Sequence, residues 1–180
     1  EFDEETLYYK GAFAECDALD LNPEIQNENI SSDDFLSQSI SQSCAISTES
    51  WTDKIKEAID FYSRSLQIKN TPVVMGRLGA ILAKYSNHSD DALGPQLLKR
   101  ASDENDLYGM FNYGLYLYKI KKDNKAAIQI FEKLYKRNHI NAALILGNLY
   151  KEENDINKAK EYYTKSYEIF GCDEAKKCID

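Results

Sequence analysis

The amino-acid sequence predicts an all-α fold of about nine or ten helices, stacked as antiparallel hairpins. Apolar side chains recur with helical spacing through most of the 180 residues, and only 3 prolines and 8 glycines interrupt them. No segment alternates polar and apolar residues for long enough to predict a strand. Gly114 and Gly147 lie 33 residues apart, and each is followed 12 residues later by an alanine, Ala126 or Ala159. A period of this length is typical of stacked helical repeats.

Helices are predicted in the first part of the chain over 4–19, 33–46, 51–68, 72–86 and 95–102. Ser50 has the residue type and spacing of a capping box, which predicts the start of the third helix. Thr71 followed by Pro72 predicts the start of the fourth, because proline at the first helical position loses no hydrogen bond. Gly94-Pro95 predicts a distorted turn over 91–94 before the fifth.

In the second part of the chain, helices are predicted over 106–120, 123–137, 140–153 and 155–170. Asp123 and Asp155 are the expected N-caps, since a short acidic side chain accepts hydrogen bonds from the first free amides. Gly171 is expected to stop the helix before it. Asp173–Ile179 then predicts the opening of one more helix, or a cap on the array.

The repeated glycine suggests a packing rule for each hairpin. We expect it to let the first helix approach the second closely, with the small alanine receiving the contact. A third copy is predicted around Gly79, with Ala92 lying 13 residues after it. Tyr150, together with Phe131 and Tyr163, is expected to fill the space between hairpins.

The repeat extends less clearly toward the N-terminus. Gly11 precedes Gly79 by 68 residues, which leaves room for a degenerate copy formed by 33–46 and 51–68. The second helix of the Gly11 copy would then fall at 22–32, a polar stretch that does not look helical.

Charge divides the chain unevenly. Residues 1–50 carry 12 acidic side chains and one lysine, a balance of -11, whereas residues 51–180 carry 18 acidic and 21 basic side chains, a balance of +3. Residues 20–50 are predicted to be an irregular, acidic, Ser-rich insertion or a degenerate repeat. Such an asymmetry is typical of intramolecular packing between the halves, of an acidic tail or of a solvated acidic face.

One motif combines both helices of the last full hairpin. It reads Ala142-Ala143-x-x-Leu146-Gly147-x-x-Tyr150, followed by Lys158-Ala159-x-x-Tyr162-Tyr163. This pattern resembles the tetratricopeptide superfamily and is most similar to its Sel-one-like subclass. The resemblance is good over 107–170, fair over 72–102 and weak before that.

The resemblance implies a right-handed superhelix in a single domain over 1–180, with a regular repeat core at 72–180. It implies a concave wall of first helices that binds a peptide or partner protein, as a non-enzymatic scaffold or adaptor within a larger complex. By matching positions, the residues facing this groove would be Tyr108, Phe111, Leu115, Tyr118, Lys119, Asn141, Leu144, Asn148, Lys151, Val73, Ala80, Ala83 and Lys84. The aromatic members are equally compatible with a buried core.

Some members of this superfamily grip a carboxylate with lysines and asparagines on three consecutive repeats. Asn112, Asn148, Lys84 and Lys119 would fit, but Gly76 and Ala80 occupy the places of a gripping lysine and asparagine. The pattern therefore argues against that function.

Residues for catalysis do not gather in the sequence. His88 and His139 fall in predicted turns, and the chain shows no nucleophile–base pair, metal cluster or phosphate-binding loop. We therefore expect no enzyme activity and no cofactor. No apolar run is long enough to span a membrane. The cysteines, which are Cys16, Cys44, Cys172 and Cys178, form no CxxC pair, and free thiols favour the cytoplasm over the alternative, a secretory-pathway lumen.

A basic patch around 119–137 offers an alternative function. Lys119 begins this segment of net charge +5, and the patch consists of Lys121, Lys122, Lys125, Lys133, Lys136 and Arg137. Such a surface could bind RNA or an anionic membrane. A solvated turn in contact with the acidic N-terminal half explains it better in a chain of pI 4.9, so a nucleic-acid partner is disfavoured.

Overall fold

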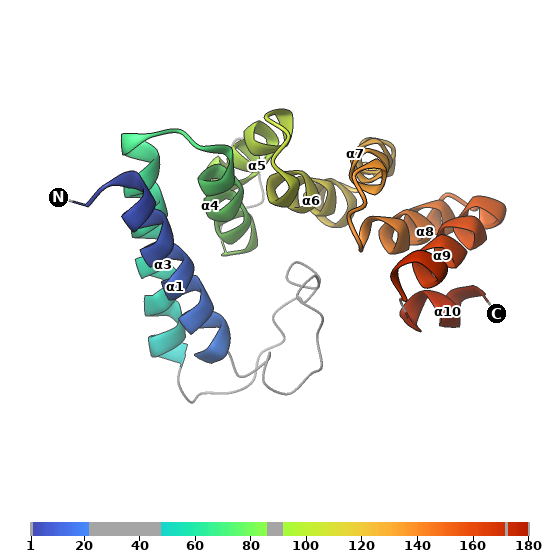
Figure 1. Ribbon diagram of the computed structural model, residues 1–180, viewed down its shortest axis with the longest axis horizontal. Coiled ribbons are helices and arrows are strands. Elements are labelled where there is room, and N and C mark those ends of the chain that lie inside the picture. Colours follow the sequence, from blue (N-terminus) through green and yellow to red (C-terminus); the bar gives the residue numbers. More distant parts are fainter. Residues whose placement is uncertain (1, 22–47, 86–91, 172, 180) are drawn as a thin grey trace. The chain divides into compact units, whose positions relative to one another are not determined.

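The computed structural model describes residues 2–21, 48–85, 92–171 and 173–179, and all its regular elements are helices (Figure 1). The predicted all-α class is therefore confirmed for the described residues. The chain forms two compact units, Glu1–Gly109 and Met110–Asp180, each of which is described by itself. The predicted helix at 33–46, the degenerate second helix at 22–32 and the predicted turn at His88 lie outside the described residues. The single continuous domain stays a prediction.

The first unit consists of two helical hairpins and the start of a third. Its helices are α1 (Glu4–Leu21), α3 (Thr48–Ile68), α4 (Pro72–Tyr85), α5 (Leu93–Asp103) and the first turn of α6 (Leu107–Leu115). Helices α1 and α3 pack side by side, and α4 packs on α5 (Figure 1). A core cluster joins both hairpins through residues that include Ile55, Tyr62, Met75 and Leu97.

The pairing of α1 with α3 corrects the predicted repeat assignment. A Cβ built on Gly11 would lie 2.6 Å from Cε1 of Tyr62, so the ring of this α3 residue fills the space beside the glycine. Helix α3 is therefore the second helix of the Gly11 hairpin, and its assignment to a separate degenerate copy was wrong. The 68-residue spacing includes a long connection rather than an extra pair of helices that α3 completes.

The second unit continues the array from the middle of α6. After α6 come a π-helix, η1 (Tyr116–Lys121), and the helices α7 (Asn124–Lys136), α8 (Ala142–Glu152), α9 (Ile156–Phe170) and α10 (Asp173–Ile179). Helix α8 pairs with α9, and α10 packs on α9 (Figure 1). The predicted boundaries of these helices are confirmed to within about two residues, the usual uncertainty of helix ends.

The helix ends test the capping predictions. Asp123 and Asp155 accept hydrogen bonds from the amides three residues later, at 3.0 and 3.2 Å, and Gly171 adopts φ +67° after α9, so these predictions are confirmed. Ser50 lies inside α3, which begins at Thr48, so the predicted capping box was wrong. Helix α5 begins at Leu93, and Gly94-Pro95 fits its first turn because those amides need no partner within the helix.

Three turns share a geometry that sequence analysis missed. Asn105, Asn138 and Asn154 adopt φ of 62°, 59° and 61°, the left-handed conformation that asparagine tolerates better than most residues. In each turn, the amide of the next residue donates to the carbonyl five residues earlier, as in a Schellman motif. The signal was an asparagine at the end of each amphipathic run.

The turn after η1 differs by one residue. Lys122 takes the left-handed position, and the amide of Asp123 donates to the carbonyl of Leu117, six residues earlier. Nine residues separate Gly114 from Asp123, whereas eight separate Gly147 from its cap. The π-helix absorbs this extra residue, because its hydrogen bonds span one residue more than those of an α-helix.

This insertion changes which alanines correspond. Ala127, with 0% exposure, takes the place of Ala159 in the α9 hairpin, whereas the predicted Ala126 is half-buried. In the α4–α5 hairpin the small residue is Gly94 rather than Ala92: a Cβ on it would lie 2.5 Å from the amide nitrogen of Ala83.

The predicted contact between glycine and alanine was also wrong. A Cβ on Gly114 would lie 2.9 Å from the ring of Phe131, and one on Gly147 would collide with the ring of Tyr163. At Gly79 the neighbour is the backbone of Leu98. The glycine therefore makes room for the residue one turn after the alanine.

Candidate partner-binding surfaces

A buried carboxylate organises the first-helix face of the first unit. Glu15, on α1, is 3% exposed and accepts a 2.7 Å hydrogen bond from the hydroxyl of Tyr62. Nη1 of Arg77, on α4, lies 3.6 Å from the same carboxylate oxygen. One acid thus joins the first hairpin to the first helix of the second.

The Arg77 side chain is half-exposed and rests on an aromatic ring. The carbon centre of its guanidinium lies 4.4 Å from the ring centroid of Tyr108, at the start of α6. Arginine presents five N–H donors in a rigid fork. Because Glu15 engages one edge and Tyr108 one face, the side chain is held in place while 35% of its surface remains open to solvent.

Two glycines bring these helices together. A Cβ on Gly76 would lie 3.2 Å from the Cα of Gly109, so α4 and the start of α6 approach closely at this point. The approach sets the ring of Tyr108 beside the residue that follows Gly76. Sequence analysis named Tyr108 but missed Glu15 and Arg77, although a lone acid beside Ala14 on an apolar stripe was a usable signal.

The electrostatics of this cluster follow from its burial. Loss of hydration raises the pKa of Glu15, while the hydrogen bond from Tyr62 and the charge of Arg77 oppose that rise. Burial, followed by the neighbouring carboxylate, raises the pKa of Tyr62 far above its usual range. Tyr62 is therefore a hydrogen-bond donor at all ordinary pH values.

In the second unit, three of the predicted groove residues are interior side chains. Phe111, Leu115 and Tyr118 are 6%, 7% and 4% exposed. The ring of Phe111 stacks on His139 with centroids 4.8 Å apart and meets Phe131 edge-on at 5.8 Å. These residues present little surface to a partner, because the short turn at His139 folds the ring of that histidine onto α6.

The other predicted residues of α8 lie nearer the surface. Asn141 and Leu144 are half-buried, and Lys151 is exposed. Asn148 is also half-buried and accepts a 2.8 Å hydrogen bond from the hydroxyl of Tyr163. Leu144 packs against the core that α8, α9 and α10 share.

Lys119 and Lys84 are half-buried, and each places its ammonium group over a neighbouring tyrosine ring. Of the other positions carried over from the Gly79 copy, Val73 is exposed, whereas Ala80 and Ala83 are buried.

The end of η1 is tied to the next hairpin. The hydroxyl of Tyr118 donates to Oε1 of Glu152 at 2.6 Å, which, after burial, raises the tyrosine's pKa above its usual range. The side-chain amide of Asn124 donates to Glu153 at 2.9 Å. The inserted residue therefore leads into a polar link between the two hairpins.

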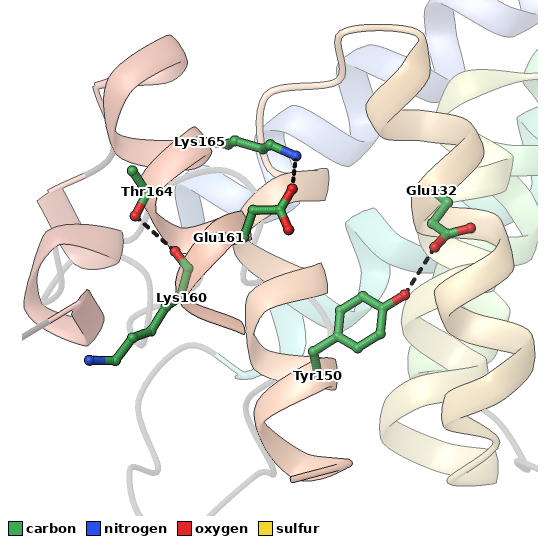
Figure 2. A network of polar contacts seen from close by, with 6 residues as sticks. All are labelled: Glu132, Tyr150, Lys160, Glu161, Thr164 and Lys165. Carbon is green, nitrogen blue, oxygen red and sulfur yellow. Dashed lines mark hydrogen bonds and ion pairs between the residues drawn. The ribbon is translucent and has the colours of Figure 1, made fainter. Parts of the chain in front are cut away.

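A second link runs between α7 and α8. Figure 2 shows the hydroxyl of Tyr150 donating to Oε1 of Glu132, at 3.0 Å. Burial and this hydrogen bond raise the pKa of Tyr150 to about 12. The ring of Tyr150 stacks on Tyr162, and Tyr162 meets Tyr135 edge-on, with centroids 5.5 and 5.6 Å apart. Tyr150 thus connects its own hairpin to the preceding one.

The predicted basic patch is exposed. Its six members are Lys121, Lys122, Lys125, Lys133, Lys136 and Arg137. Nη1 of Arg137 also lies 3.6 Å from the sulfur of Met110. Within the described part of the chain, no three metal-ligating side chains gather, and no helix is both long and apolar enough to cross a membrane.

The described residues define a helical-repeat protein, since successive hairpins repeat one glycine contact and one type of turn. Comparison with protein families identifies part of this repeat: the tetratricopeptide repeat model matches residues 140–170, which contain α8 and α9. Comparison with curated proteins gives no match. Tetratricopeptide repeats generally mediate protein–protein interactions, and this fold is typically a non-enzymatic scaffold.

Proposed function

We propose that this protein is a non-enzymatic adaptor that binds a partner protein or peptide on the exposed faces of its first helices. The observation that supports this most strongly is the arrangement of Arg77. A guanidinium held between a buried carboxylate and a tyrosine ring loses little freedom on binding. Buried structural charges are normally covered, whereas this group stays partly open to acceptor oxygens of a partner.

The remaining predicted residues extend this proposed surface within each unit. In the first unit they are Tyr108 and Lys84, and in the second Lys119, Asn141, Leu144, Asn148 and Lys151. Arginine and tyrosine are the residue types that most often carry the binding energy of an interface. We therefore place the strongest contact at Arg77 and Tyr108 and treat the α8 residues as supporting contacts.

A photo-crosslinking amino acid at position 108 tests this proposal in the natively purified protein. Mass spectrometry should identify a specific partner crosslinked at position 108, and Arg77→Gln should lower its yield about tenfold. The same crosslinker at Lys99, an exposed residue of α5, is the matched control. Equal yields of the same partner at both positions would rule out the proposed face. Thermal denaturation would show whether each variant is folded.

Three finer assignments belong to this proposal. The Sel-one-like subclass is supported by the small pair Ala142-Ala143, both fully buried at the start of α8. A cytoplasmic location is supported by the free thiols of Cys16 and Cys178. A role in assembling a larger complex follows from the adaptor function. The alternative, binding of RNA or an anionic membrane at 119–137, stays a prediction that the next experiment also tests.

A further inference from the structure

The outer face of α7 carries charge that its own helix does not neutralise. Lys125, Lys133 and Lys136, here called the α7 stripe, are exposed and form no ion pair within the described part of the chain. At 3.6 residues per turn they fall within roughly 80° of arc, and they span ~16 Å along the axis. The exposed residue among them is the neutral Gln129.

Other helices of the chain treat their basic residues differently. In α3, Lys54, Lys56 and Arg64 each pair with an acid three or four residues away. In α9, Lys158 pairs with Asp155, and Figure 2 shows Lys165 paired with Glu161. Pairs at this spacing are the usual neutralisation of a solvent-exposed helix face. The α7 stripe departs from this pattern.

Tyr150 contributes to that departure. Glu132 is the one acid in the sequence of α7, four residues before Lys136 and so within reach of it. The hydroxyl of Tyr150 holds the Glu132 carboxylate toward α8 instead (Figure 2). The stripe therefore keeps its full positive charge.

We propose that the α7 stripe binds an acidic segment of a partner polypeptide, at a surface separate from the first-helix faces. Its three charges are lysines, which pair with single carboxylates, whereas nucleic-acid recognition favours arginine forks and open aromatic faces. The nearby Tyr135 is half-buried with its ring against Tyr162. Because the chain carries a net charge of -8, an acidic peptide must find a local positive surface.

Fluorescence anisotropy on the full chain tests this proposal. The probe is a fluorescein-labelled peptide of about twelve residues with alternating glutamate and serine, long enough to span the stripe, beside its glutamine–serine counterpart. We expect the acidic peptide to bind, and the triple variant Lys125→Gln, Lys133→Gln, Lys136→Gln to bind it about tenfold more weakly. The charge-matched control replaces the exposed Lys99, Lys160 and Lys177 by glutamine and should change affinity less than about twofold.

Tyr150→Phe adds a test of the positioning role. Releasing Glu132 should weaken peptide binding about twofold, and adding Glu132→Gln to that variant should restore it. Equal affinity of wild type and triple variant would overturn the proposal. So would preferential binding of single-stranded RNA or of phosphatidylserine vesicles that the triple variant loses, because the stripe would then belong to those ligands. Unchanged affinity of Tyr150→Phe would overturn the role given to Tyr150.

Discussion

The hairpins α1/α3 and α8/α9 bury the same pair of residues but satisfy it differently. In both, a tyrosine ring of the second helix fills the space beside a glycine of the first: Tyr62 beside Gly11, and Tyr163 beside Gly147. The hydroxyl of Tyr163 donates to the neutral amide of Asn148. The hydroxyl of Tyr62 donates instead to a buried carboxylate.

This difference has a functional consequence. An amide acceptor is satisfied within its own hairpin, whereas a buried carboxylate needs a positive charge as well. In the first unit Arg77 supplies that charge from α4. A packing unit shared by both hairpins thus acquires, in one of them, a fixed and partly exposed guanidinium. The proposed binding face arises from that substitution of acceptor.

The largest expected effect comes from removing the two rings. Tyr62→Ala and Tyr163→Ala should each lower the free energy of unfolding by about 3–5 kcal/mol, because both rings are fully buried and leave a cavity. Urea denaturation measures both values. A cost below about 1 kcal/mol at either position would show that the two hairpins do not share this packing unit.

Removing only the hydroxyls should separate the two hairpins. Tyr62→Phe leaves Glu15 without its donor and should cost about 2–3 kcal/mol, because the group left behind is a buried charge. Tyr163→Phe leaves a half-buried amide that water can reach and should cost about 1 kcal/mol. Equal costs in urea denaturation would refute the distinction between charged and neutral acceptors.

The two acceptors should also differ in pH dependence. Because burial raises the pKa of Glu15 above its ordinary value of 4.5, the folded protein holds this proton to higher pH than the unfolded chain. The stabilisation from the protonated form is complete below the unfolded pKa and is lost as pH rises through the folded pKa. The stability of wild type relative to Glu15→Gln should therefore fall as pH rises above about 4.5.

Urea denaturation of both proteins across a pH series measures this difference. Parallel stability curves would contradict the raised pKa. Asn148→Gln is the matched substitution in the other hairpin, and its difference from wild type should not vary with pH because neither side chain titrates.

Local signals in the sequence predicted most of the helices. Asp123 and Asp155 cap as expected because a cap depends on residues within one turn. Glu15 and Arg77 escaped prediction because their contact depends on long-range pairing. It requires α1 to pair with α3 across 22–47, and α4 to meet α6 where two glycines touch.

The extra residue of η1 escaped for a different reason. The spacing from Gly114 to Gly147 is 33 whether the residue lies before or after the cap, so glycine spacing alone could not locate it. The cap-to-cap distance, 32 residues from Asp123 to Asp155, contains the missing information. Comparing both distances would have placed one insertion between Gly114 and Asp123.

The middle hairpin, α6–η1/α7, gives the smallest expected effect and the finest test of the shared geometry. Deleting Lys121, an exposed residue of η1, should let the amide of Asp123 reach the carbonyl of Leu117 with the five-residue span of the other turns. The free energy of unfolding should change by less than about 1 kcal/mol, because a π-turn is no more stable than the α-helical turn that replaces it.

Deleting Lys151 from α8 is the matched control, since that turn already has the shorter span. It should cost more than about 2 kcal/mol, because the Schellman bonds and the register of Asp155 would both be lost. If both deletions cost the same in urea denaturation, the π-helix would not be an insertion into a common hairpin. The link from Tyr118 to Glu152 would then be the reason that the longer span is kept.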